Sequence, residues 1–367
     1  MSAIAIDVAV KFVLAVIVVF AVLNLAGIQT WMERKQSAVM QDRIGANRAT
    51  FALPWWWAAP INVLLRKLGG LGLLHPLADV IKLLTKEDFS PASGNRTLHT
   101  LAPWISVFFA LIVFAAIPFG DRIELFGRTI ELQVAHLNAA LLYILALASI
   151  GIYGVIIAGM ASGTNLSVIG GLRAASQMLA YEIALGVSLV GVVIWYGTLD
   201  LQEMIRRQGE LWWGWMPAWG VFVQPVGCLV FITAALAETK RIPFDLPEGE
   251  PEIIGYFVEY SGMKFGLFFL TDFVETTLVA ALTTVLFFGG WQIPWLPPDA
   301  FAQPIMAVLG VVAFTLKVSF FLWLFMTIRW TLPRFRYDQL MRLGWKGLFP
   351  VSLANVGITS LMRILVH

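Results

Sequence analysis

The sequence has little cysteine and no clustered histidine. Its only cysteine is Cys228, which excludes a disulfide framework, a thiolate zinc site and a cysteine-held iron–sulfur cluster. The four histidines (His75, His99, His136 and His367) never fall within one helical turn of each other, so paired haem or metal ligation is not supported. Nothing resembles a Walker loop or a dinucleotide-binding glycine fingerprint. If the chain takes part in redox chemistry, its electrons come from another subunit.

Charge is scarce as well. Only 13% of the 367 residues are charged, the net charge is +2, and no run of like charges stands out, which argues against a nucleic-acid partner. Hydrophobic residues make up 59% of the chain, and the mean hydropathy is +0.79. A water-soluble fold cannot bury that much apolar surface, so lipid must be the solvent. We therefore predict a single polytopic membrane domain over residues 1–367.

Eight apolar runs reach the length of about 20 residues that a helix needs to cross a bilayer. Only helices fit, because each helix satisfies its own backbone groups in lipid. The first run has no basic residue before it and Arg34 and Lys35 after it, which indicates a retained helix rather than a cleaved signal peptide. The prediction is an all-α integral membrane protein with spans at roughly 8–31, 100–119, 137–161, 174–196, 219–237, 264–289, 305–328 and 347–366.

Lysine and arginine are distributed unequally between the two sets of loops. Loops after odd-numbered spans hold 18 of them, whereas the other loops and the C-terminus hold 5. Because such an excess marks the cytoplasmic side, both termini are predicted to lie outside. The predicted cytoplasmic loops are residues 32–99, 162–173, 238–264 and 329–346.

The first of these loops contains two further apolar segments. Residues 48–72 are interrupted by prolines and are predicted to be interfacial or re-entrant. The stretch HPLADVIKLLTKE, residues 75–87, places three charged residues on one helical face. This pattern predicts an amphipathic helix that lies on the membrane or under a partner.

Four ionisable residues lie well away from the ends of predicted spans, and a charge costs several kcal/mol at the bilayer centre. They are Glu182, Asp272, Glu275 and Lys317. Snorkelling or a structural ion pair is the alternative to a functional role. Glu275 fits a functional role least well, and a lone polar residue facing a partner subunit is its alternative.

Residues 237–264 hold six of the 23 acidic residues. Three of them, Glu248, Glu250 and Glu252, alternate along the chain, so their mutual repulsion favours proton uptake. Apolar residues and prolines run through the same stretch, as expected of a packed segment. A solvated surface loop is the alternative. We predict a proton-handling site in this loop.

Six stretches of the chain together resemble one known family. They are similar to the H subunit of respiratory complex I, the membrane subunit at the quinone site of proton-pumping NADH:quinone oxidoreductase. The stretches are ERKQSAVMQDRIGANR (33–48), HPLADVIKLLTKE (75–87), SQMLAYEIALG (176–186), AETKRIPFDLPEGEPE (237–252), EYSGMKFGLFFLTDF (259–273) and PRFRYDQLMRLGWK (333–346).

The resemblance implies an eight-helix subunit of the bacterial inner membrane, with both termini on the periplasmic side. It implies contact with the hydrophilic arm through the cytoplasmic loops, and with neighbouring membrane-arm subunits and lipid. The chain would form much of the quinone tunnel and use quinone as a substrate. It would hold no prosthetic group and have no activity alone, because FMN and iron–sulfur clusters would lie on partner subunits.

The resemblance also implies roles for individual residues. Glu33, Arg34, Arg43, Asp79 and Lys82 would line or brace the quinone tunnel near its opening. Arg241, also assigned to the quinone site, would serve with Lys317 as a counter-charge. An acidic funnel would couple quinone reduction to proton translocation through Glu182, Glu238, Asp245, Glu248, Glu250, Glu252, Glu259 and Asp272.

Some positions depart from the family's pattern, and other functions stay open. Ala46 replaces a usual proline, His75 a usual glutamine and Asp272 a usual glutamate, and the chain is longer than usual between Asn47 and His75. One alternative is the equivalent subunit of a membrane-bound hydrogenase or a ferredoxin-fed complex. A stand-alone ion transporter is disfavoured because no inverted hydropathy repeat and no broken-helix pair is seen. A pure scaffold leaves the charges inside the spans unexplained.

Overall fold

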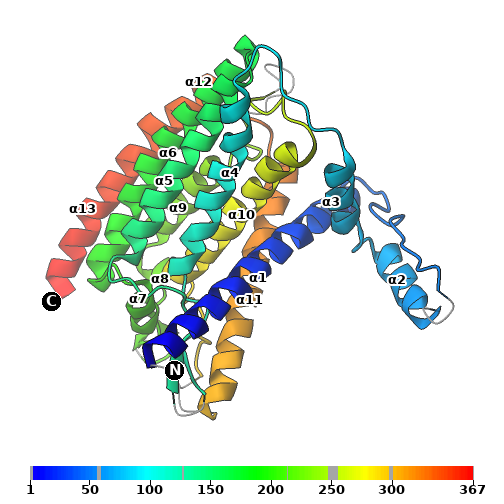
Figure 1. Ribbon diagram of the computed structural model, residues 1–367. Helices are drawn as coiled ribbons and strands as arrows, with labels where there is room; N and C mark the ends of the chain where they lie inside the picture. The colour runs from blue at the N-terminus through cyan, green and yellow to red at the C-terminus, as the bar shows by residue number, and fades with distance from the viewer. Residues whose placement is uncertain are drawn as a thin grey trace.

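The computed structural model describes residues 3–55, 59–125, 128–212, 214–246, 255–296 and 301–366. Over these residues the chain forms a bundle of long helices that run side by side (Figure 1). The long helices are α1 (Ala3–Met40), α4 (Arg96–Ile112, extended by the 3-10 turn η2, Val113–Ala116), α5 (Ala140–Ala161), α6 (Asn165–Tyr196), α9 (Pro225–Glu238), α10 (Gly262–Phe287), α11 (Gln303–Thr331) and α13 (Phe349–Val366).

The short elements lie between these helices. They are α2 (Ala59–Leu71), α3 (His75–Thr85), α7 (Leu201–Gln208), α8 (Gly220–Val223), α12 (Tyr337–Arg342) and the π-helical stretch η3 (Leu343–Leu348). Two antiparallel hairpins complete the described structure. One pairs β1 (Arg122–Leu125) with β2 (Arg128–Glu131), and the other pairs β3 (Leu211–Trp212) with β4 (Met216–Pro217).

Seven of the described helical segments are long and apolar enough to cross a membrane, which confirms a multi-pass helical protein. Several of them extend beyond the apolar runs that predict them: α1 continues to Met40 and α6 begins at Asn165. The predicted loops 32–99 and 162–173 are therefore shorter. At 1.5 Å per residue the 32-residue helix α6 is about 48 Å long, more than the roughly 30 Å of hydrocarbon, so its polar first turns project beyond the lipid.

The fifth predicted span, 219–237, is broken, so the expectation that no helix is interrupted is wrong for this span. The one-turn helix α8 ends at Gln224, whose backbone (φ −131°, ψ 57°) is not helical, and α9 then starts with Pro225. Helix α9 has 14 residues, about 21 Å, which is too short to cross the hydrocarbon by itself. The buried side chain of Gln224 donates to Thr359 Oγ1 (2.5 Å) and accepts from Asn355 Nδ2 (2.7 Å), so helix α13 stabilises the break.

Helix α10 occupies the centre of the bundle. Its most apolar 18-residue window is 78% buried, whereas that of α1 is 11% buried. A helix that is apolar all round belongs in the interior, and α10 contacts α1, α3, α4, α9 and α11. Helices α5 and α6 approach closely at two glycines, because a Cβ on Gly159 would lie 2.8 Å from the Ser167 carbonyl oxygen and 3.2 Å from the Gly171 Cα. Small residues of this kind allow close packing in lipid.

Helices α2 and α3 form a bent pair, with an angle of 92° between them. The amphipathic helix predicted at 75–87 is confirmed as α3, which packs on α1 and α10. Leu83 of α3 lies against Gly266 of α10, where an added Cβ would come within 2.8 Å of the leucine side chain. Helix α2, within the segment 48–72, stands away from the bundle (Figure 1).

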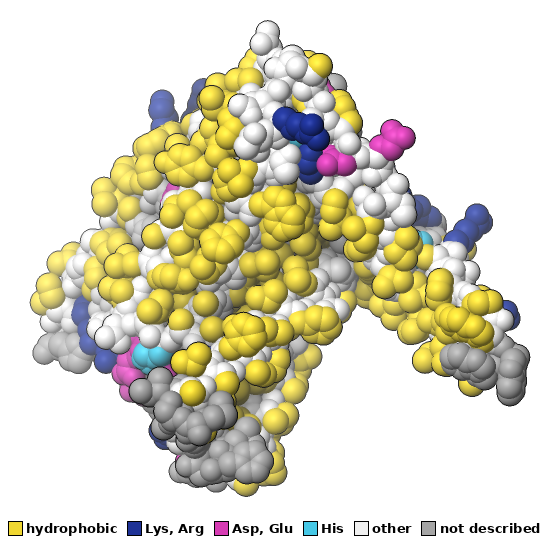
Figure 2. Space-filling model, in the orientation of Figure 1, with side chains coloured by type: hydrophobic (Ala, Val, Ile, Leu, Met, Phe, Trp, Pro, Cys, Tyr) yellow, Lys and Arg dark blue, Asp and Glu magenta, His cyan; other side chains and the backbone are white. Residues whose placement is uncertain are grey.

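Hydrophobic side chains cover most of the visible face of the bundle, and charged side chains gather at its ends (Figure 2). This distribution suits a surface in contact with lipid. The two chain termini lie toward the same end of the bundle, the end that carries α7 (Figure 1). Which side of the membrane that end faces stays a prediction from the lysine and arginine count.

Candidate functional site

A buried lysine joins the acidic loop to the central helix. Lys240 follows the end of α9, is 3% exposed, and lies 3.3 Å from Asp272 Oδ1 and 3.5 Å from Glu275 Oε2 of α10. Burial lowers the pKa of the Lys240 ammonium, but the nearby carboxylates of Glu275 and Asp272 outweigh burial, so the net shift of that pKa is well above its usual value. Lys240 is therefore the cationic partner of both carboxylates.

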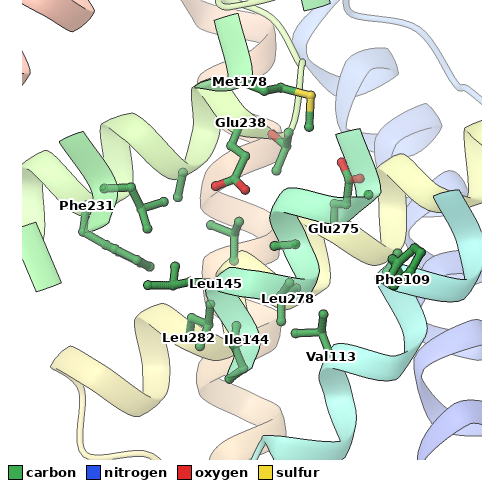
Figure 3. Close-up of a pocket in the computed structure, with 17 residues that line it drawn as sticks. Phe109, Val113, Ile144, Leu145, Met178, Phe231, Glu238, Glu275, Leu278 and Leu282 are labelled. Atoms are coloured by element: carbon green, nitrogen blue, oxygen red, sulfur yellow. The ribbon is translucent and has the colours of Figure 1, made fainter. Parts of the chain in front are cut away.

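Glu275 and Glu238 face one cavity from two helices (Figure 3). Glu238 ends α9 and Glu275 lies near the middle of α10. The rest of the lining is mostly apolar and includes Phe109, Leu145 and Phe231. The cavity holds about 40 Å³, which at roughly 10–15 Å³ per molecule is room for about three waters between the carboxylates and the apolar wall.

Glu182 lies near the middle of α6, where an ionisable side chain is costly in lipid. The hydroxyl of Ser149 on α5 donates a short hydrogen bond to its carboxylate Oε1. The charge of Glu182 acts on Glu238, as does the charge of Glu275. The three carboxyls from α6, α9 and α10 thus form one electrostatic group.

Glu33 of α1 lies at the opposite end of the site from Glu182. Its carboxylate lies 2.7 Å from Arg329 of α11 and 4.0 Å from Arg241 of the loop. The Arg241 guanidinium also stacks 4.1 Å from the centre of the Phe273 ring, next to Asp272 in sequence. The charge of Arg241 also acts on Glu275, so Arg241 links Glu33 of α1 electrostatically to the carboxyls of α10, α9 and α6. We call this set the acid chain: Glu33, Asp272, Glu275, Glu238 and Glu182.

Asp245 belongs to the same loop but has a separate partner. Its carboxylate is buried and lies 2.8 Å from Arg334, which follows α11. The loop is held on α6 by Gln177, whose amide nitrogen donates to the carbonyls of Ala237 (2.7 Å) and Phe244 (2.6 Å). These hydrogen bonds position the residues between Glu238 and Asp245.

Three of the six residues assigned to the quinone tunnel meet at α3. Asp79 binds Arg34 of α1 at 2.5 Å and Lys82 of its own helix at 3.4 Å. Glu33 and Arg34 are neighbours on α1, and their side chains contact different elements. Arg43 lies beyond the end of α1 and donates to Gln41 and Ser37.

Lys317 lies apart from the acid chain. Its ammonium donates to the carbonyls of Phe288 (2.8 Å), Gly290 (3.0 Å) and Gln292 (2.7 Å), and it lies 4.8 Å from the centre of the Trp219 ring. The family resemblance implies a counter-charge for carboxylates, whereas the structure places this cation on the carbonyl groups that follow α10. A helix C-terminus attracts positive charge for the same electrostatic reason.

Three predicted residues, Glu248, Glu250 and Glu252, lie outside the described residues. Glu259 is described, and its backbone carbonyl accepts a hydrogen bond of 3.2 Å from His99 Nε2. The His99 ring stacks on Tyr260 with 4.0 Å between the ring centres, which ties the end of the loop to α4.

Sequence reasoning missed Lys240 and Arg329, and it gave Glu275 the least support of the charges inside the spans. The alternative that Glu275 is a lone polar residue is wrong, because it lies 3.5 Å from Lys240 and lines the cavity. One signal was present: Asp272 and Glu275 are three residues apart and so share one helix face, where a single cation can contact both. No signal in the sequence pairs Arg329 with Glu33.

A multi-pass helical bundle with a continuous set of carboxyls in its interior defines a membrane protein that holds charge inside the bilayer. A protein-family profile described as NADH dehydrogenase matches residues 12–360. The NADH-quinone oxidoreductase H subunit of Thermomicrobium roseum is 43% identical over 362 residues, 97% of this chain and 96% of the relative. An H subunit of the same enzyme from Geobacter metallireducens is 41% identical over the full length of both chains, and one from Cytophaga hutchinsonii is 42% identical over 92% of each.

The chain belongs to this family, that of the membrane-embedded H subunit of NADH-quinone oxidoreductase. The resemblance seen in its motifs is thereby confirmed.

Proposed function

We propose that the chain couples quinone reduction to proton movement in the membrane part of a bacterial complex I. The hydrophilic arm would dock on its cytoplasmic loops, and neighbouring membrane subunits would cover its lipid-facing helices. Electrons would come from flavin and iron–sulfur clusters on those partners, and quinone would be the substrate. Within this assembly the acid chain would carry the proton response.

The observation that supports this proposal most is the continuity of the acid chain. Its carboxyls come from α1, α10, α9 and α6, and Glu238 and Glu275 face one cavity with room for water. Buried carboxyls at short range cannot all ionise freely, so a change of charge at one end alters proton binding at the next. Reduction of a quinone consumes two protons and supplies such a change.

The ion pairs at α3 support the proposed position of the quinone site. Arg34 and Asp79 connect α1 to α3, and Glu33, the next residue, begins the acid chain. A quinone head group bound at Arg34 would therefore lie close to Glu33, the first carboxyl of the acid chain. Arg43, Lys82 and Arg241 would complete the charged surroundings.

The test is Glu238→Gln in the whole complex in membranes. The amide keeps the shape of the carboxyl but cannot exchange a proton. Quinone reduction and proton pumping per assembled complex should fall together, whereas electron transfer from NADH to an artificial acceptor stays intact. The matched control is Glu203→Gln on α7, because Glu203 pairs with Arg207 outside the acid chain. Full pumping in assembled Glu238→Gln complex would refute the relay.

The equivalent subunit of a hydrogenase or a ferredoxin-fed complex is the second candidate. The matched relatives carry the name NADH-quinone oxidoreductase, which favours the first proposal. Mass spectrometry of the proteins that co-purify with the chain would distinguish an NADH-oxidising module from a hydrogenase or a ferredoxin-fed module.

A further inference from the structure

Lys240 occupies an unusual place in the backbone. Helix α9 ends at Glu238, and Lys240 has a left-handed backbone with φ 56°, rare for a residue with a side chain. Its amide nitrogen donates to the Ala237 carbonyl at 3.3 Å, which closes the turn. Lys240 then contacts α10, whereas the next residue, Arg241, contacts Glu33 of α1. Two consecutive cations thus serve two different parts of the acid chain.

One ammonium is shared between two carboxylates. Asp272 and Glu275 share a face of α10, are 13% and 20% exposed, and lie 3.3 and 3.5 Å from Lys240 Nζ. Both distances exceed those of a short charge-assisted hydrogen bond. Asp272 Oδ1 and Glu275 Oε2 have no well-aligned hydrogen-bond donor among the described residues. Their charge is therefore balanced by proximity to Lys240.

The three acids differ in whether a cation lies beside them. Asp272 and Glu275 each have the cation at contact distance, whereas no ion pair within 4 Å is seen for Glu238 in the described part of the chain. Glu238 instead faces Glu275 across the cavity, and the charge of Glu182 also acts on it. A carboxyl near two other acids binds a proton more readily than a carboxyl beside a cation.

We propose that Lys240 is a positioning residue that offsets the charge of Asp272 and Glu275 and leaves Glu238, which has no cation at contact distance among the described residues, as the carboxyl that takes up and releases the proton. This inference rests on the proposed function. Lys240 thereby sets the pH range in which the acid chain works. The titratable groups that act on Lys240 are Asp272 and Glu275 of α10 and Tyr256 of the loop. Glu238 is acted on by Lys240, Glu275 and Glu182 of α6, and Glu275 also by Arg241, which lies 4.0 Å from Glu33 of α1.

The test changes the net charge of Lys240, Asp272 and Glu275 by substitution and measures the pH profile of quinone reduction. This net charge is −1 when both acids are ionised. In the intact complex, Lys240→Met keeps the aliphatic stem and makes this charge −2. The acidic limb of the pH profile of quinone reduction should then move to higher pH by roughly 1–3 units, the effect of losing an opposite charge at close range. Glu275→Gln makes the charge 0 and should move that limb to lower pH.

The double variant Lys240→Met/Glu275→Gln returns the charge to −1, so the acidic limb of its pH profile should return close to the wild-type position. Lys240→Arg keeps the cation and should also keep the profile. Lys86→Met is the matched control, because Lys86 directly follows α3 and is exposed. This variant should leave the profile unchanged. A purely structural lysine would affect assembly but would not move the profile in opposite directions for the two single variants.

Two results would overturn the inference: an assembled Lys240→Met complex with the wild-type profile, or an assembled double variant whose acidic limb stays where Lys240→Met alone places it. If Lys240→Met does not assemble, Glu275→Gln decides, because an unchanged acidic limb there contradicts a role for the shared cation. Normal pumping in Glu238→Gln would instead refute the proposed function itself. Loss of pumping in Glu238→Gln, together with unchanged profiles in the Lys240 and Glu275 variants, would refute this inference alone.

Discussion

The guanidinium of Arg329 lies 2.7 Å from the carboxylate of Glu33, which joins the most peripheral long helix, α1, to α11. The side chains are only 22% and 15% exposed, so the pair is largely shielded from water. Removing one partner of a shielded pair leaves the other charge uncompensated. This contact therefore bears on both the stability of α1 and the first carboxyl of the acid chain.

Arg329→Gln should destabilise the protein by about 1–3 kcal/mol, less than the roughly 3–5 kcal/mol of a fully buried pair, because Arg241 still lies near Glu33. The measurement is the midpoint of thermal inactivation of the complex. Glu33→Gln/Arg329→Gln should recover part of the loss, since no charge is left alone. Arg336→Gln is the control, because Arg336 and Asp338 form an exposed pair and the midpoint should not change. Equal shifts in Arg329→Gln and Arg336→Gln would contradict the prediction.

Glu182→Gln tests the far end of the acid chain. The amide can still accept the Ser149 hydrogen bond but cannot exchange a proton, so turnover should fall roughly tenfold or more while assembly is kept. The measurement is quinone reduction per complex, with complex content checked on native gels. Ser149→Ala, which removes the donor and leaves the carboxyl, should have a smaller effect. Near wild-type turnover and pumping in Glu182→Gln would leave Glu182 with a structural role only.

Asp79→Asn tests the quinone side. Loss of its charge breaks the ion pairs with Arg34 and Lys82, so the KM for quinone should rise roughly fivefold, the effect of about 1 kcal/mol. The value of kcat should change less, because Asp79 lies outside the acid chain. Glu87→Gln, beyond the end of α3, is the matched control. An unchanged KM in Asp79→Asn, or an equal rise in the control, would argue against a role for this pair at the quinone site.

Gln224→Leu tests the broken span. The substitution removes both side-chain hydrogen bonds between the break and α13, and it leaves Asn355 without its acceptor. We expect a loss of about 1 kcal/mol, the usual scale of such bonds in membranes, measured as a lower midpoint of thermal inactivation. Thr315→Val is the control, because the Thr315 hydroxyl bonds only within its own helix. A midpoint that stays at the wild-type value would mean that α9 is held by packing alone.

Local composition was enough to predict the class of the protein and most of its helices. A span must match the thickness of the hydrocarbon, so a run of apolar residues predicts it without knowledge of any neighbour. The cost of charge in lipid likewise singles out Glu182 and Asp272 from their positions within apolar runs. The motifs around Glu33 and Glu238 identified the family, because motif matching needs only the order of residues.

The tertiary structure alone decided which of these charges meet. Hydropathy says how deep a residue lies but not which helix it faces, so the pairing of Arg329 with Glu33 was invisible along the chain. The same holds for Lys240, whose left-handed turn directs it to Asp272 and Glu275 while its neighbour Arg241 serves another helix. The break at Gln224 also depends on partners from α13, about 130 residues away, since a non-helical backbone in the bundle persists only where a distant side chain binds it.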